Sequence, residues 1–270
     1  MNAPICKLAA VQLIAGPDVA SNLIEAARLI AEAATQGAQL VLLPEYFACI
    51  SADETAKIGL REAPGHGPIQ AFLSEAARRY SVWLIGGTLP LQASDDLHVL
   101  NTCLVFNPQG EQVARYDKIH LFGFKRGAES YDEARTIEAG HKVVTFDGPC
   151  GRVGLSVCYD LRFPELYRRM GAVDLIVVPA AFTATTGRAH WEVLLRARAI
   201  ENQCYVLASG QGGTHPSGRQ TWGHSMLIDP WGEIVASLGA GAGVVCGHFD
   251  PQRIASVRES LPALKHRIFD

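Results

Sequence analysis

The order of predicted strands and helices is the same in two parts of this 270-residue chain. In each part a short apolar strand precedes a second strand with a proline near its end, a helix, a third strand and a two-stranded hairpin. The matching segments are 7–13 with 152–158, 40–46 with 175–181, 69–80 with 190–202, 82–88 with 205–209, and the turns 107–110 with 229–232. Two halves of β-α-β-α-β-β order predict two sheets packed face to face with helices outside. We therefore expect an α/β fold, a four-layer α-β-β-α sandwich with two pseudo-symmetric halves.

The two halves are not separated by a Ser/Gly-rich segment or a run of charge. We therefore expect one domain over residues 1–270. The tail, about 249–270, is basic and mixed, and we expect it to extend across a partner subunit.

Composition excludes several classes of partner. The net charge of −3 leaves no basic surface for nucleic acid and no polybasic patch for a membrane, so we expect a small-molecule partner. The chain shows neither a signal-peptide pattern nor a run of 18 apolar residues, which predicts a cytoplasmic protein. Its seven cysteines and nine histidines are scattered without metal-ligand spacing, so we expect no metal site and no cofactor.

The stretch GRVGLSVCYDLRFPEL, residues 151–166, joins a buried strand to a helix. Cys158 lies where the strand ends, an edge at which α/β folds bind their ligands. A thiol there, with free backbone N–H groups beyond it, has the surroundings of a nucleophile with an oxyanion site. The alternative is a buried structural cysteine, which is the commoner case.

Two more polar residues end apolar runs. Glu45 closes QLVLLPE, and Lys118 follows the second strand of the first hairpin. Strand ends of the same sense converge on one sheet edge, so we expect both near Cys158. Glu45 would take the thiol proton, while Lys118 and the N–H of Tyr159 would stabilise a tetrahedral intermediate. A carboxylate, an ammonium and a thiol arranged in this way predict acyl transfer.

Other interpretations of these residues stay open at this point. A papain-like Cys–His pair would use His120 or His190. Taken alone, Glu45 would also fit a helix or loop cap, and Lys118 would fit a solvated lysine at the end of a strand. We expect the arginines 162, 168 and 169 on a helix surface, with Arg162 nearest the elbow.

Three segments resemble the motifs of one enzyme family. VLLPEYF (41–47), YDKIHLF (116–122) and GLSVCYDLRFPEL (154–166) are similar to the Glu, Lys and Cys motifs of the nitrilase superfamily of carbon–nitrogen hydrolases. The resemblance covers the whole chain and implies an α-β-β-α sandwich that forms homodimers or larger oligomers through the Cys-side helices and the tail. It also implies that Glu45 is the general base, Lys118 the oxyanion stabiliser and Cys158 the nucleophile. The family's second glutamate matches Glu133, which would hold Lys118, better than Glu129.

Within the superfamily the resemblance is strongest to the Nit-type amidases, through CYDLRFPEL and the segments 181–206 and 222–233. Cys158-Tyr159-Asp160 differs from the Cys-Trp-Glu of true nitrilases, which disfavours nitriles. The resemblance therefore implies a thiol amidase for a small carboxylate substrate, deaminated glutathione ahead of α-ketoglutaramate. The loop 123–130 differs in length from either branch. Alternatives are an omega-amidase, an N-carbamoyl amino acid hydrolase and an inactive binding module on the same fold.

Residues next to the motifs are expected to line the substrate pocket. They are Tyr46, Phe122, Tyr159, Phe182 and Thr186.

Overall fold

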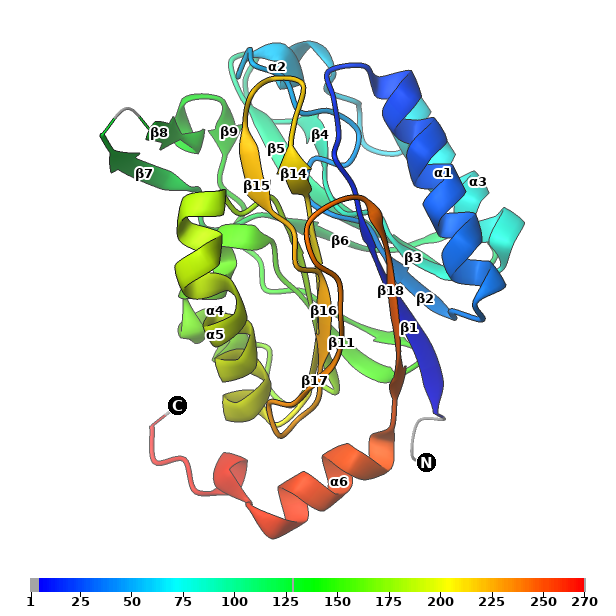
Figure 1. The fold of residues 1–270 in the computed structure, drawn as a ribbon, viewed down its shortest axis with the longest axis vertical. Coiled ribbons are helices and arrows are strands. Elements are labelled where there is room, and N and C mark those ends of the chain that lie inside the picture. Colours follow the sequence, from blue (N-terminus) through cyan, green and yellow to red (C-terminus); the bar gives the residue numbers. More distant parts are fainter. Residues whose placement is uncertain (1–4, 128, 270) are drawn as a thin grey trace.

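Two mixed β-sheets form the centre of the structure, a computed structural model that describes residues 5–127 and 129–269 (Figure 1). In the first sheet β18, β1, β2, β3, β5 and β4 are neighbours in this order, and β6 and β9 also pair with β5. Its strands are β1 (Cys6–Gln12), β2 (Leu40–Leu42), β3 (Trp83–Ile85), β4 (Leu89–Gln92), β5 (Val99–Phe106), β6 (Gln112–Asp117), β9 (Ile137–Glu138) and β18 (Gly243–Phe249).

The second sheet has the order β10, β11, β12, β13, β16 and β17. Its strands are β10 (Thr145–Gly148), β11 (Gly151–Leu155), β12 (Leu175–Ala180), β13 (Tyr205–Gly210), β16 (Met226–Ile228) and β17 (Ile234–Ser237). In each sheet three parallel strands, β1-β2-β3 or β11-β12-β13, are followed by an antiparallel hairpin strand. The predicted internal repeat is therefore present in the strand pairing.

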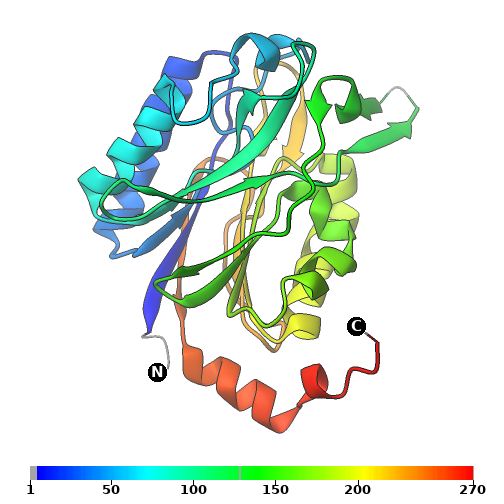
Figure 2. The ribbon, with the colours of Figure 1, turned by 180° about the vertical axis from the view of Figure 1, so that it is seen from behind.

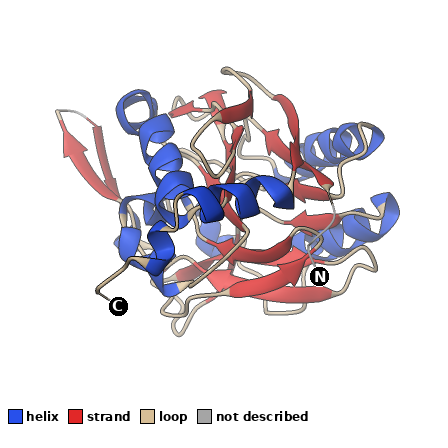
Figure 3. Ribbon diagram, turned by 90° about the horizontal axis from the view of Figure 1, so that it is seen from below, coloured by secondary structure: helices blue, strands red, loops and turns tan. Residues whose placement is uncertain are grey.

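Helices cover the outer face of each sheet, so the predicted α-β-β-α sandwich is confirmed. The first sheet is covered by α1 (Val19–Thr35) and α3 (Pro68–Tyr80), and the second by α4 (Pro164–Arg169) and α5 (Ala184–Asn202). Figure 3 shows the strand layers between helices on both sides, and Figure 2 shows the same packing from behind. Among the described residues, no helix is long and apolar enough to cross a membrane.

Period-two alternation along β1 explains the layers. Leu8 and Ala10 pack in one core with residues of β11, β12 and β13, whereas Ala9 and Val11 pack against α1 and α3. Successive side chains of a strand point to opposite faces, so one strand contributes to both cores. We call the first of these the inter-sheet core.

The central strands are shorter than predicted. β2 ends at Leu42 because Pro44 has no N–H to donate, and Tyr46 then takes a left-handed φ of 56°. Glu45 therefore lies in a turn after the strand.

Helix α5 is longer than predicted. It begins at Ala184 and not at residue 190, because Thr183 caps it by accepting a hydrogen bond from the N–H of Thr186 at 3.2 Å.

Several elements have no periodic signal in the sequence. The polar loop after Lys118 contains a hairpin of β7 (Gly123–Arg126) and β8 (Glu129–Asp132), which is followed by η1 (Glu133–Arg135). The remaining elements are α2 (Ala56–Gly59), η2 (Cys158–Arg162), the hairpin of β14 (Gly212–Thr214) and β15 (Gln220–Trp222), α6 (Pro251–Ser260) and η3 (Ala263–Lys265).

The C-terminal segment differs from a simple extended tail. β18 runs antiparallel to β1 from Gly243 to Phe249, and α6 then crosses one end of the sandwich (Figure 1). Contact of the segment 249–270 with a partner subunit stays a prediction, and residue 270 lies outside the described residues.

Candidate active site

A buried lysine lies between two carboxylates at one edge of the sheets. Lys118 is fully buried, and its Nζ donates to Glu45 Oε1 at 2.9 Å and to Glu133 Oε2 at 2.7 Å. The carboxylate of Glu45 is 1% exposed and also accepts from Asn101 Nδ2 at 3.0 Å and from the backbone N–H of Ala181 at 2.9 Å. Glu45 is therefore fixed by contacts from both halves of the chain.

Glu133 is held just as firmly. Its Oε2 accepts from the backbone N–H of Phe122 at 2.7 Å, and its Oε1 accepts from the hydroxyl of Tyr46 at 2.8 Å. Glu133 opens η1, directly after the β7–β8 hairpin, which folds the loop back onto Lys118. The structure thus brings together Glu45, Lys118 and Glu133, three of the residues singled out from the sequence.

The charges of this cluster support one another. Burial disfavours the charged form of Lys118, but the carboxylates of Glu133 and Glu45 outweigh it and raise the pKa of Lys118 well above its usual value. Burial likewise works against ionised Glu133, yet Lys118 keeps the pKa of that carboxyl below its usual value. Both groups are therefore charged at neutral pH.

Cys158 forms the elbow predicted from the sequence. It has a left-handed φ of 51°, which is uncommon outside glycine, and its side chain is only 7% exposed. Burial raises the pKa of the thiol well above its usual value, the charge of Glu45 raises it further, and Lys118 acts in the opposite direction. The resting thiol is thus protonated, and it needs a base at the moment of attack.

The elbow is held in place by Asp160, for which the sequence pattern predicts no such role. Its fully buried carboxylate accepts from the N–H of Val157 at 2.8 Å, the hydroxyl of Tyr116 at 2.7 Å and the N–H of His120 at 3.0 Å. The ring Nδ1 of His120 also lies 2.7 Å from Asp160 Oδ1. Asp160 therefore ties the turn that carries Cys158 to the segment that carries Lys118.

This arrangement disfavours a Cys–His pair. The ring of His120 is engaged by Asp160 and stacks on Phe163, with ring centroids 3.7 Å apart. His190 lies exposed on α5, where its Nδ1 accepts from Arg162 at 3.1 Å. Neither histidine lines a pocket with Cys158. The less favoured Glu129 accepts from Thr185 Oγ1 at 2.8 Å and not from Lys118.

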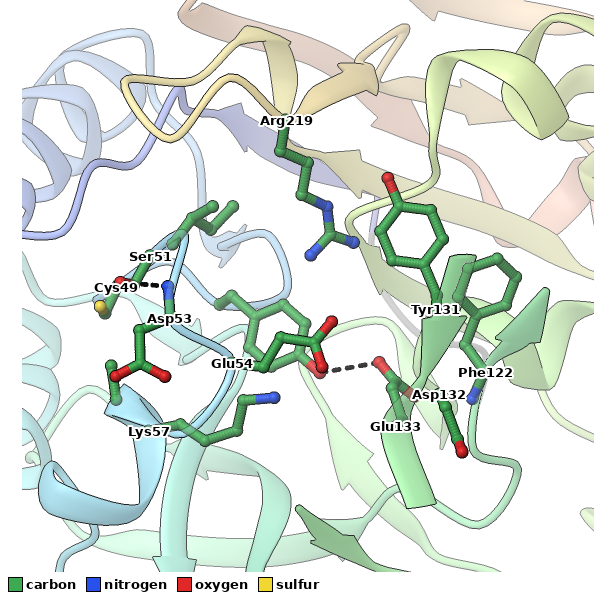
Figure 4. Close-up of a pocket in the computed structure, with 13 residues that line it drawn as sticks. Cys49, Ser51, Asp53, Glu54, Lys57, Phe122, Tyr131, Asp132, Glu133 and Arg219 are labelled. Carbon is green, nitrogen blue, oxygen red and sulfur yellow. Dashed lines mark hydrogen bonds between the residues drawn. The ribbon is translucent and has the colours of Figure 1, made fainter. Parts of the chain in front are cut away.

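Two pockets share part of their lining, and the inner one contains the thiol of Cys158. The inner pocket is lined by Glu45, Cys158, Tyr159, Arg162, Phe182 and Thr186, among others. The outer pocket, drawn in Figure 4, is lined by Tyr46, Asp53, Glu54, Lys57, Tyr131 and Asp132, among others. Phe122, Glu133 and Arg219 line both pockets, so the two pockets adjoin.

The predicted pocket residues fall into these two places. Phe122, Tyr159, Phe182 and Thr186 line the inner pocket, and Phe122 also lines the outer one. Tyr46 lines the outer pocket and not the inner one, and it donates to Glu133.

Three cationic residues line the pockets. Arg162, which we expected on a helix surface near the elbow, lines the inner pocket instead, where its guanidinium lies 5.6 Å from the ring centroid of Tyr159 and 5.3 Å from that of Phe182. Lys57 and Arg219 reach the outer pocket from α2 and from the turn before β15. Neither element has a hydrophobic period that fixes its position, so nothing in the sequence pattern marks these two residues.

The geometry is suited to acyl transfer. A thiol, a carboxylate and an ammonium lie in one buried cluster beside a pocket, and the ammonium can favour an oxyanion where water is largely excluded. Among the described residues, no group of three His, Cys, Asp or Glu side chains is positioned to hold a metal ion.

Comparison with known proteins agrees with this chemistry. The model of the carbon–nitrogen hydrolase family matches residues 7–259. The chain belongs to the carbon–nitrogen hydrolase family, and the prediction of this family from its motifs is confirmed.

Relatives within the family include amidases. A deaminated glutathione amidase of Synechocystis sp. is 44% identical over 268 residues, which cover 97% of each chain. The deaminated glutathione amidase of Yersinia enterocolitica is 40% identical, with 97% of this chain and 93% of that one covered. The omega-amidase NIT2 of Homo sapiens is 39% identical, with 98% and 95% covered.

Solved structures show the same fold. The Caenorhabditis elegans NitFhit protein matches with a TM-score of 0.89 and 38% identity, over 99% of this chain and 66% of that longer chain. Nit3 of Saccharomyces cerevisiae, described as a member of branch 10 of the nitrilase superfamily, matches with a TM-score of 0.88 and 33% identity, over 98% and 97% of the two chains.

Proposed function

We propose that this chain hydrolyses the amide bond of deaminated glutathione through a thioester on Cys158. The observation that carries the proposal is the buried set of Glu45, Lys118 and Cys158 at the wall of the inner pocket. The two relatives called deaminated glutathione amidase, at 44% and 40% identity over nearly the whole chain, support this substrate.

Acylation uses the thiol and its neighbouring carboxylate. The proton of the Cys158 thiol passes to Glu45 as sulfur attacks the amide carbon, and an S–C bond forms. Lys118 and the backbone N–H of Tyr159 stabilise the resulting oxyanion. The C–N bond then breaks, and Glu45 gives its proton to the leaving nitrogen. The acyl group stays on sulfur as a thioester.

Deacylation repeats the same proton movements with water. Glu45 takes a proton from a water that attacks the thioester carbon, and Lys118 again stabilises the oxyanion. The S–C bond breaks, the thiol of Cys158 regains its proton from Glu45, and a carboxylic acid leaves. Glu133 acts as a positioning residue because it holds Lys118 and does not itself exchange a proton.

Arg162 fits the acyl part of such a substrate. The acyl group of deaminated glutathione is a 2-oxo acid whose carboxylate needs a cationic partner. Arg162 lines the same pocket as Cys158, and its guanidinium is oriented by Tyr159 and Phe182. An arginine held in this way can bind a carboxylate through two N–H groups.

The experiment is a substrate panel. We expect deaminated glutathione to be cleaved with the highest kcat/KM, α-ketoglutaramate more slowly, and an N-carbamoyl amino acid and a simple nitrile not measurably. Release of 2-oxoglutarate is measured for the first two, and release of ammonia for the others. Preference for α-ketoglutaramate would make the chain an omega-amidase, the second candidate, which the 39% identical human relative favours. Turnover of the carbamoyl compound alone would contradict the proposal.

We further propose a single catalytic domain that works in the cytoplasm as a homo-oligomer. In support, Ile268 is 89% exposed and Phe269 86% exposed at the end of the C-terminal segment, beside Arg168 and Arg169 of α4. Apolar side chains of this size gain free energy when a partner covers them. Sedimentation of the purified chain should give a mass of at least twice 29.1 kDa, the mass of one chain. Replacing Ile268 and Phe269 by Asp should lower this measured mass. A wild-type monomer would contradict the oligomer, and cell fractionation tests the location.

A further inference from the structure

The outer pocket is lined by two cations, Lys57 and Arg219, and by the carboxylates of Asp53, Glu54, Asp132 and Glu133. Figure 4 shows the side chains of Lys57 and Arg219 pointing into this pocket from opposite sides. Across residues 5–127 and 129–269, neither side chain forms a salt bridge, and the Nε of Arg219 is buried without a hydrogen-bond partner. Buried polar groups are normally paired, so this one is available to a ligand.

Both side chains are held in position by the surrounding structure. Lys57 Nζ donates to Thr136 Oγ1 at 3.1 Å and lies 5.8 Å from the ring centroid of Tyr46. The guanidinium of Arg219 donates to the carbonyl of Ala181 at 3.2 Å and lies 5.3 Å from the ring centroid of Tyr131. Groups oriented in advance bind a ligand at a lower entropic cost.

The surroundings of Lys57 favour an anion. Burial lowers the pKa of its ammonium, although Glu133 and Glu54 act in the opposite direction, and Arg219 lowers it further. Two like charges in one partly buried site are stabilised when an anion lies between them. Of the four carboxylates in this pocket, Glu133 is engaged by Lys118, Phe122 and Tyr46, and Asp53 Oδ1 accepts from the N–H and hydroxyl of Thr55 at 2.8 and 2.7 Å. Glu54 extends into the space between the two cations (Figure 4), so a ligand carboxylate that reaches both of them would take the position that Glu54 holds.

We propose that Lys57 and Arg219 bind the carboxylate of the leaving group and thereby select amides of an anionic amine over amides that release ammonia. This inference rests on the proposed function. In deaminated glutathione the leaving group is a dipeptide that ends in a glycine carboxylate, which extends at most about 7 Å from the scissile nitrogen. Phe122, Glu133 and Arg219 line both pockets, so the dipeptide would pass these three residues on its way from Cys158 to the outer pocket.

The test compares two substrates that share one acyl group. Deaminated glutathione and α-ketoglutaramate both form the same thioester, but only the first has a carboxylate in its leaving group. For Lys57→Gln and Arg219→Gln, we expect the ratio of kcat/KM for deaminated glutathione to that for α-ketoglutaramate to fall about 10- to 100-fold, mainly through KM. Deaminated glutathione amidated at its glycine carboxylate should show a similar loss with the wild-type enzyme.

Two further variants sharpen the result. Glu54→Gln removes a negative charge that lines the same pocket, so it should lower KM for deaminated glutathione. Arg79→Gln changes the net charge by the same amount as Lys57→Gln on the exposed surface of α3, and the ratio should stay at its wild-type value.

Each other outcome counts against the inference. Equal losses on both substrates would mean that the two cations serve the acyl part or the fold, and an unchanged ratio would mean that they do not contact the dipeptide. If the wild-type enzyme cleaves neither substrate, the proposed function fails and the inference fails with it. Activity on the first substrate with an unchanged ratio overturns the inference alone.

Discussion

Replacing Cys158 by Ala is expected to lower kcat for deaminated glutathione by about 10⁵-fold, because no other group can form the thioester. The fold should persist, since Ala removes only a sulfur at the wall of a pocket and leaves Asp160 to hold the elbow. Steady-state release of 2-oxoglutarate measures the loss, and thermal unfolding followed by circular dichroism checks the fold.

The matched control is Cys246→Ala. Cys246 is a half-buried thiol on β18, outside both pockets, so its removal should leave kcat unchanged. Brief treatment of the wild-type enzyme with iodoacetamide should abolish its activity. Mass spectrometry should then find the label on Cys158. Substantial turnover by Cys158→Ala would rule out the thioester mechanism.

Replacing Lys118 by Met is expected to destabilise the protein by about 3–5 kcal/mol at pH 7, because it leaves two buried carboxylates without their cation. Glu45 and Glu133 both lose the ammonium that lies 2.9 and 2.7 Å from them. Urea unfolding of the variant and the wild type measures the difference. Lys142→Met, on an exposed loop, is the control and should change the stability by at most about 0.5 kcal/mol.

The contribution of ionised Glu133 to the free energy of unfolding should have opposite signs in the wild type and in Lys118→Met, so the difference in stability between them should depend on pH. In the wild type the pKa of Glu133 is lowered, so its contribution is full above the usual value of 4.5 and is lost as the pH falls through the lowered pKa. In Lys118→Met the ammonium is lost, and only the N–H of Phe122 and the hydroxyl of Tyr46 still oppose burial, so we expect a higher pKa for Glu133 and a free-energy cost of ionising it in the folded variant. The gap in stability should therefore narrow as the pH falls below 7. A gap that widens in acid would contradict the assigned charges.

Much of the fold and part of the site follow from local patterns. The two apolar runs 40–46 and 175–181 have the same order of residue types because both are central parallel strands, covered on each side. Glu45 stands out because it closes an apolar run, and Lys118 because it follows the second strand of a hairpin. The prediction that these ends converge needed only the sense of the strands.

Other parts of the site depend on contacts between distant residues. Asp160 reads as an ordinary helix-start acid, yet its carboxylate meets Tyr116 and His120, 44 and 40 residues away. Arg219 comes from a turn between two short strands of mixed burial, which carry no periodic signal. The β7–β8 hairpin, which brings Glu133 back to Lys118, could not be predicted from the sequence for the same reason. Its two strands are short and half-exposed, so their sequence is typical of a polar loop.

The division of the reacting groups between the two halves has a consequence for how the rate responds to mutation. Glu45 and Lys118 belong to the first sheet and its loops, whereas Cys158 follows β11 of the second, and the inter-sheet core separates the two. Densely packed side chains transmit changes of volume as small displacements. Altering the size of Leu8 or Val177, neither of which lines the inner or the outer pocket, is expected to strain the contacts that cross between the halves, Ala181 to Glu45 and His120 to Asp160, and so to shift the base relative to the thiol. We therefore expect turnover to respond to the spacing of the two sheets, so that changes deep in the fold tune it without any contact with the substrate.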